Sequence, residues 1–76
     1  MDNIFKEVDK EALDKYIVML PKYGESWREM PIHQLQRKLQ EETAELLEGK
    51  DLLEIHREAL DVINVARMIA ERTKDA

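Results

Sequence analysis

Apolar residues recur every three or four positions along most of the chain, the spacing typical of amphipathic α-helices. The longest such series is Leu52, Ile55, Ala59, Val62, Ala66 and Ile69. A second series is Ile32, Leu35, Leu39 and Leu46, and a looser one is Ile4, Val8, Ile17 and Leu20. The pattern predicts three helices, over about residues 3–20, 31–48 and 52–73.

Residues that favour helix ends flank these segments. Asp2 or Asn3 is expected to cap the first helix and Asp51 the third, because a short side-chain oxygen accepts a hydrogen bond from a free amide of the first turn. Pro21 is expected to end the first helix, since the residue before a proline is disfavoured in the α conformation. Gly49 is expected to end the second helix in a left-handed conformation.

Residues 21–30 form the predicted connector between the first two helices, and they include the only tryptophan of the chain. A short helical turn starting at Ser26 fits within this connector. Pro31 fits the first turn of the next helix, where its missing N–H costs nothing.

The third predicted helix is apolar on several faces, which indicates burial on several sides. A chain of 76 residues and 9.0 kDa forms one small domain, over residues 1–76, and has few residues with which to cover such a helix. No cysteine is present, so disulfides cannot stabilise it. We therefore expect an all-α fold, with an N-terminal helix and an antiparallel helical hairpin that completes a four-helix-type bundle by oligomerisation. A homodimer is the minimum assembly, and a dimer of dimers is the alternative.

Composition and charge limit the kinds of partner and the cellular compartment that can be expected for this chain. A net charge of −5 argues against binding to a nucleic-acid polymer, which usually requires a basic face. No apolar run approaches the roughly 20 residues of a membrane span. The first residues have neither the basic segment nor the apolar segment of a secretory signal, so a cytoplasmic protein is expected.

Two pairs of carboxylates are the most informative polar residues. Glu42 and Glu45 are three residues apart and therefore share a helix face. Glu58 and Asp61 have the same relation on the next helix. In an antiparallel hairpin, the residue numbers of two facing positions add up to the same total along its length. The pair 42 and 61 gives the same total as the pair 45 and 58, so both pairs can face each other. The four carboxylates are therefore expected to converge.

Converging carboxylates repel one another unless their pKa values rise or a cation binds. Oxygen ligands alone suit Mg²⁺ or Mn²⁺, or Ca²⁺ in a looser cage. A di-iron site would need a Glu-x-x-His motif, which is missing. The alternative is that these residues belong to solvated acidic faces, as is common on glutamate-rich helices.

At these residues the sequence resembles the MazG-type all-α nucleotide pyrophosphohydrolases, whose motif is E-E-x-x-E followed by E-x-x-D. The corresponding segments here are residues 41–45 and 58–61, and residues 23–27 resemble the Y-G-x-S-W segment of some small members. The likeness covers about residues 22–69.

The resemblance implies an enzyme that splits nucleoside triphosphates between the α and β phosphates, releasing a monophosphate and pyrophosphate. It implies Mg²⁺ ligands at Glu42, Glu45, Glu58 and Asp61, with Mn²⁺ as an alternative metal. Glu41 would lie behind these ligands or orient the attacking water. The implied role is removal of noncanonical or excess nucleotides from the cellular pool.

Five further residues are candidates for substrate binding. Trp27 and Tyr23 could stack on a base, although Trp27 fits equally well as a core residue. His33 could contact a base or a phosphate, although a plain surface histidine is the simpler interpretation. Asn64 lies one helical turn beyond the acidic pair and could bond a phosphate or a metal-bound water. Lys38 could meet a phosphate or be an ordinary surface charge.

Two other functions remain open from the sequence. One is a dedicated dUTP, dCTP or phosphoribosyl-ATP hydrolase, because residues of the base pocket decide that specificity. The other is a helical oligomerisation or regulatory module without catalysis, whose acidic side chains would face solvent.

Overall fold

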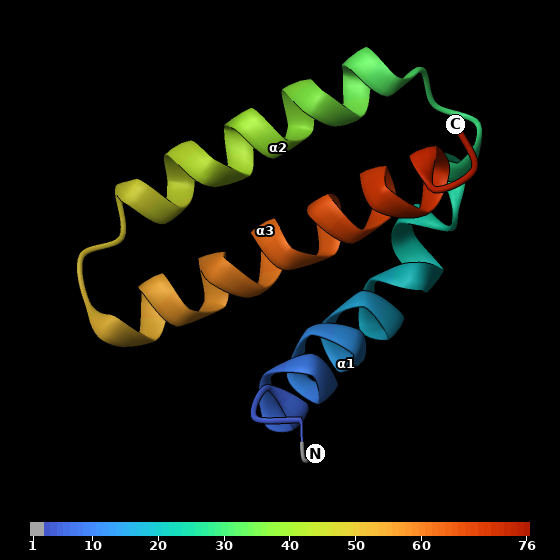
Figure 1. Cartoon of the computed structure of the whole chain (residues 1–76). Helices are drawn as coiled ribbons and strands as arrows, with labels where there is room; N and C mark the ends of the chain where they lie inside the picture. The colour runs from blue at the N-terminus through green and yellow to red at the C-terminus, as the bar shows by residue number, and fades with distance from the viewer. Residues whose placement is uncertain (1–2) are drawn as a thin grey trace.

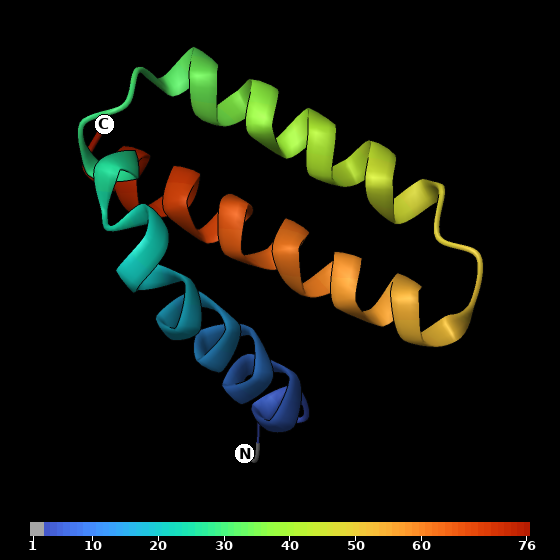
Figure 2. The ribbon, with the colours of Figure 1, turned by 180° about the vertical axis from the view of Figure 1, so that it is seen from behind.

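The computed structural model describes residues 3–76, apart from the side chain of Tyr23, and it is all-α as predicted. Three α-helices follow one another, α1 (Lys6–Tyr23), α2 (Ile32–Leu47) and α3 (Leu52–Thr73), with a 3₁₀ turn η1 (Ser26–Arg28) after α1. Helices α2 and α3 pack side by side as an antiparallel hairpin, and α1 packs on α3 (Figures 1 and 2). The predicted hairpin and the helical turn at Ser26 are confirmed.

The predicted ends of the first helix are wrong. Pro21 lies inside α1, where it removes one backbone donor but has a φ compatible with the helix. The helix ends instead at Gly24, whose φ of 61° suits glycine and whose N–H donates to Leu20 O at 2.7 Å. At the other end Asn3 forms a turn before the helix, accepting from Phe5 N at 2.9 Å, and Phe5 is the N-cap residue. Asp2 lies outside the described residues.

The hairpin turn is built around Gly49 and Asp51. The left-handed conformation predicted for Gly49 is wrong, because Gly24 is the one glycine of residues 3–76 with a positive φ. Glycine is needed at 49 for a different reason, since a Cβ there would lie 2.6 Å from Ile55 Cγ1. The predicted cap at Asp51 is confirmed: its side chain accepts from Glu54 N at 2.8 Å. Pro31 is the residue just before α2 rather than in its first turn.

The core is small and lies where the three helices meet. Its fully or nearly buried apolar side chains are Ala12, Leu35, Leu60 and Val65. The longest apolar series of the sequence begins at Leu52, but it is not buried at the start of α3, because Leu52 is 84% exposed. Leu47 and Leu53 are also exposed there, so the tip of the hairpin presents uncovered apolar side chains.

The connector is held against the end of α3 by Arg72. Its Nη1 donates to the backbone oxygens of Trp27 and Met30, each at 2.6 Å. This anchor places η1 beside α3 and brings Trp27 back toward the helices that carry the acidic residues. Within residues 3–76, no helix combines the length and the hydropathy of a membrane-spanning segment.

Candidate metal centre

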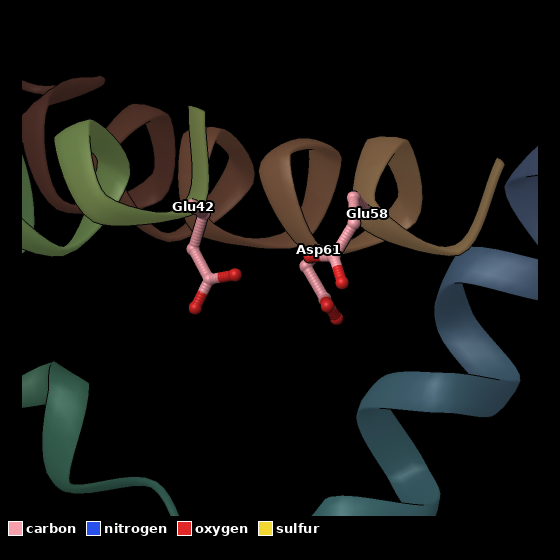
Figure 3. Close-up of side chains that lie close together, drawn as sticks. All are labelled: Glu42, Glu58 and Asp61. Carbon is pink, nitrogen blue, oxygen red and sulfur yellow. The ribbon is translucent and has the colours of Figure 1, made fainter. Parts of the chain in front are cut away.

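Three of the four predicted carboxylates meet on the hairpin. Glu42 extends from α2, while Glu58 and Asp61 extend from successive turns of α3 (Figure 3). One carboxylate oxygen of each lies within 4.8 Å of those of the other two, and all three side chains are partly buried. The antiparallel register and the three-residue spacing on α3 account for this convergence.

Glu45 borders this triad. Its side chain is exposed, and it is not among the three clustered carboxylates. Its charge and its hydrogen bonding nevertheless raise the pKa of both Glu42 and Glu58, so it lies within reach of each. Glu41 is exposed and is not in the triad either.

Burial and mutual repulsion make ionisation of the triad costly. Burial is the first cause that raises the pKa of Glu42, followed by the charges of Glu45 and Asp61. The same causes, in the same order, raise the pKa of Glu58. Two lysines nearby act in the opposite direction: Lys38 lowers the pKa of Glu42, and Lys15 lowers that of Glu58.

One oxygen of the triad has no partner. Glu58 Oε2 is buried, and no donor in the described part of the chain bonds to it. A buried carboxylate oxygen without a donor is costly, and a cation would satisfy it. Oxygens bound to one octahedral Mg²⁺ are about 3.0–4.2 Å apart, as follows from bonds of about 2.1 Å. The triad is close to that spacing, so its residues fit a hard divalent cation after small side-chain movements.

Lys15 is a member of the site that the sequence did not reveal. Its Nζ lies 2.9 Å from Asp61 Oδ1 and donates to Arg57 O at 3.1 Å. It comes from α1, so only the packing of α1 on α3 brings it to the triad. No motif or spacing in the sequence indicates that packing.

A half-open cavity of about 430 Å³ adjoins the triad, within the usual size range of small-molecule sites. Glu42 and Asp61 both line it, and so do the ammonium-bearing side chains of Lys15 and Lys38. Its apolar lining includes the following residues from all three helices and the connector: Met19, Leu20, Trp27, Met30, Leu35, Val65 and Met68. The cavity therefore joins acidic, basic and apolar surfaces.

Trp27 borders this cavity with its indole fixed in place. Its Nε1 donates to Tyr16 OH at 3.0 Å, and the hydroxyl of Tyr16 donates to Glu25 Oε1 at 3.4 Å. The guanidinium of Arg28 lies 4.7 Å from the centre of the indole ring. Trp27 is half-buried and lines the cavity, so it is neither a fully buried core residue nor an exposed one. The side chain of Tyr23 lies outside the described residues.

The remaining candidates separate into two groups. Asn64 lines the cavity, but its Nδ2 donates to Ala12 O at 2.9 Å and so fastens α1 to α3. Lys38 lines the cavity beside Glu42. His33 lies instead in an open depression on the outer face of α2, with Arg37 and Leu39, and is not brought to the triad.

Comparison of the chain with protein-family models, with curated proteins and with solved structures found no match.

Proposed function

We propose that this chain is a Mg²⁺-dependent nucleoside triphosphate pyrophosphohydrolase that yields a nucleoside monophosphate and pyrophosphate. One observation carries the proposal: three carboxylates converge, one has an unpartnered buried oxygen, and the other two line a cavity that two lysines and a tryptophan also line. Acidic residues alone would repel a triphosphate. The lysines beside them make sense if a cation and a polyanion bind together.

Each residue has a distinct task in this proposal. Glu42, Glu58 and Asp61 hold Mg²⁺ or Mn²⁺, and Glu45 supplies a further oxygen from the exposed edge. The bound cation supplies Lewis acidity at a phosphoryl oxygen and lowers the pKa of water. Lys38 attracts the phosphates into the cavity, and the indole of Trp27 offers an apolar wall for the base. The role of Glu41 in orienting water rests on the family resemblance alone.

The direct test is pyrophosphate release from a panel of ribo- and deoxynucleoside triphosphates, with Mg²⁺ and with EDTA. We expect metal-dependent formation of monophosphate and pyrophosphate in equal amounts. The panel also includes dUTP, dCTP and phosphoribosyl-ATP, and activity on one of these alone would identify a dedicated hydrolase. A folded chain that neither binds Mg²⁺ nor releases pyrophosphate from any of them would favour the non-catalytic helical module.

We further propose that a second copy of the chain covers its uncovered apolar surface. The accessible surface is 6158 Å², whereas a compact monomer of 9.0 kDa has about 4,900 Å². The excess of about 1,300 Å² falls in the range of about 1,000–2,500 Å² that one partner of an obligate homodimer buries. The exposed leucines at the hairpin tip, together with Leu13 and Ile17 on α1, supply apolar surface for such an interface.

Sedimentation velocity tests this assembly. We expect a mass of at least twice the 9.0 kDa of one chain, and of four times that value for a dimer of dimers. Leu52→Lys, which places a charge on an 84% exposed position, should shift the distribution toward the single chain without loss of helicity. A single species of 9.0 kDa at about 100 μM would contradict the assembly.

A further inference from the structure

Lys15 lines the cavity and also contacts a carboxylate of the triad directly. Its ammonium lies 2.9 Å from Asp61 Oδ1, and the two side chains are about equally exposed, at 32% and 31%. A second bond at 3.1 Å, to the backbone oxygen of Arg57, holds the ammonium at the surface of α3. Lys15 is therefore the cation that neutralises this carboxylate in the metal-free chain.

That ion pair competes with the binding of a divalent cation to the same carboxylate. A cation bound to Asp61 would lie within a few ångströms of the ammonium, and two positive charges at that distance repel each other strongly. The lysine side chain is flexible along four methylene groups, so its ammonium can swing away while the backbone of α1 stays in place.

The cavity offers the displaced ammonium a new position. Lys15 lines it next to Asp61, together with Lys38. A phosphate chain in the cavity would present oxygens to both ammonium groups, and charge-assisted hydrogen bonds to phosphate are among the stronger polar contacts.

We infer that Lys15 is a positioning residue for the polyphosphate. Its ammonium neutralises Asp61 until a divalent cation binds there, and it then moves to a phosphoryl oxygen of the substrate. The inference rests on the proposed function, because it requires that the triad binds a cation and that the cavity binds phosphates.

The first experiment measures the binding of Mn²⁺ alone by isothermal titration calorimetry, without nucleotide. Lys15→Met removes the competing charge, so we expect Mn²⁺ to bind about three- to tenfold more tightly than to the wild-type chain. Lys15→Arg retains the charge and should bind as the wild type does. Lys10→Met is the matched control, since Lys10 is an exposed lysine of the same helix and is not a lining residue of the cavity.

The second experiment measures the binding of inorganic triphosphate in saturating Mg²⁺. Here the expected effect of Lys15→Met has the opposite sign, a weakening of about tenfold or more, because one charge-assisted contact is lost. Lys15→Arg should restore most of the affinity, and Lys10→Met should leave it unchanged. A purely structural lysine would change melting temperature but would not move the two affinities in opposite directions.

Three polar contacts besides that of Lys15 hold α1 on α3, so we expect the Lys15 variants to keep this packing. The contacts are Asp9 with Arg67, Glu11 with His56, and Asn64 with the backbone of Ala12. Circular dichroism of each variant verifies its helix content before titration.

The outcomes separate this inference from the proposed function. If the wild-type chain binds no Mn²⁺, the proposed function fails and the role of Lys15 fails with it. If the wild type binds Mn²⁺ and triphosphate but Lys15→Met leaves either affinity unchanged, the role of Lys15 is overturned and the metal centre stands.

Discussion

We expect Mg²⁺ to stabilise this chain, and we expect Glu58→Gln to abolish that stabilisation and to reduce pyrophosphate release about a hundredfold or more. Glu58 belongs to the triad, and its buried Oε2 has no hydrogen-bond partner. A cation bound at the triad would therefore interact with this carboxylate most directly. Mg²⁺ at a hundred times its dissociation constant stabilises a folded state by about 2.7 kcal/mol. For a chain of this size that corresponds to roughly 10–20 °C in melting temperature, and the variant should lose nearly all of it.

The same substitution should leave the metal-free chain folded and at least as stable as the wild type. Burial and the charges of Glu45 and Asp61 raise the pKa of Glu58, so removal of its charge relieves repulsion within the folded state. An amide can also donate a hydrogen bond to a neighbouring carboxylate, which an ionised glutamate cannot do.

Glu48→Gln is the matched control, because Glu48 is an exposed glutamate at the end of α2 and is not in the triad. It should keep both the Mg²⁺ shift and the turnover. Melting curves with EDTA and with Mg²⁺, recorded at one chain concentration, measure the first effect, and a pyrophosphate assay measures the second. Full turnover in Glu58→Gln would remove this residue from the site.

The hairpin was predictable because its signals are local. Asp51 caps α3 through an amide three residues away, and the turn is too short for any arrangement other than an antiparallel pair. The constant sum of facing positions then places Glu42 opposite Asp61. The same reasoning predicted that four carboxylates converge; Glu42, Glu58 and Asp61 do so, whereas Glu45 is exposed and is not in the cluster.

The limits of α1 were not predictable from the same kind of signal. A proline usually ends a helix, but Pro21 lies in its last turn, where the loss of one hydrogen bond is tolerated. Gly24 provides the actual end, because its positive φ lets its N–H bond back to the last turn. The choice between two neighbouring stop signals depends on where the connector must go, and that is set by the distant contact of Arg72.

The contacts between α1 and the rest of the site also lay beyond the sequence. Lys15 meets Asp61 across 46 positions of the chain, and Tyr16 meets Trp27 across the connector. Both depend on how α1 crosses α3, for which the loose apolar series of the first helix gives no unique register. The sequence therefore indicated the acidic residues of the site but not the lysine that neutralises one of them.

Without divalent cations, the raised pKa values of Glu42 and Glu58 should make this chain more stable as the pH is lowered toward 4.5, the reverse of ordinary acid destabilisation. The pKa values of Glu42 and Glu58 are raised above the ordinary value of 4.5. Between that value and their raised values, the folded chain holds protons that the unfolded chain has lost. The state that binds more protons is favoured as the pH falls, so the free energy of unfolding rises.

Two other carboxylates affect the stability of the chain over a different pH range. Hydrogen bonds and charge from Arg28 lower the pKa of Glu25, and those from Lys74 lower the pKa of Glu71. Their contribution is present above 4.5 and is lost as the pH falls below it. The effect of Glu25 and Glu71 therefore lies below 4.5, whereas that of Glu42 and Glu58 lies above it, so pH separates the two.

Mg²⁺ should reverse the dependence of stability on pH above 4.5. The cation binds ionised carboxylates, so protons compete with it, and the stability that it adds must decrease as the pH falls. Urea unfolding from about pH 5 to about pH 8 should give two curves that approach each other at low pH and diverge at high pH, one with EDTA and one with Mg²⁺. The double variant Glu42→Gln/Glu58→Gln should flatten both curves, because it removes the two carboxylates for which protons and the cation compete. Parallel curves for the wild-type chain would mean that cation binding is not linked to ionisation of the triad, and the metal centre would then have to be sought at other residues.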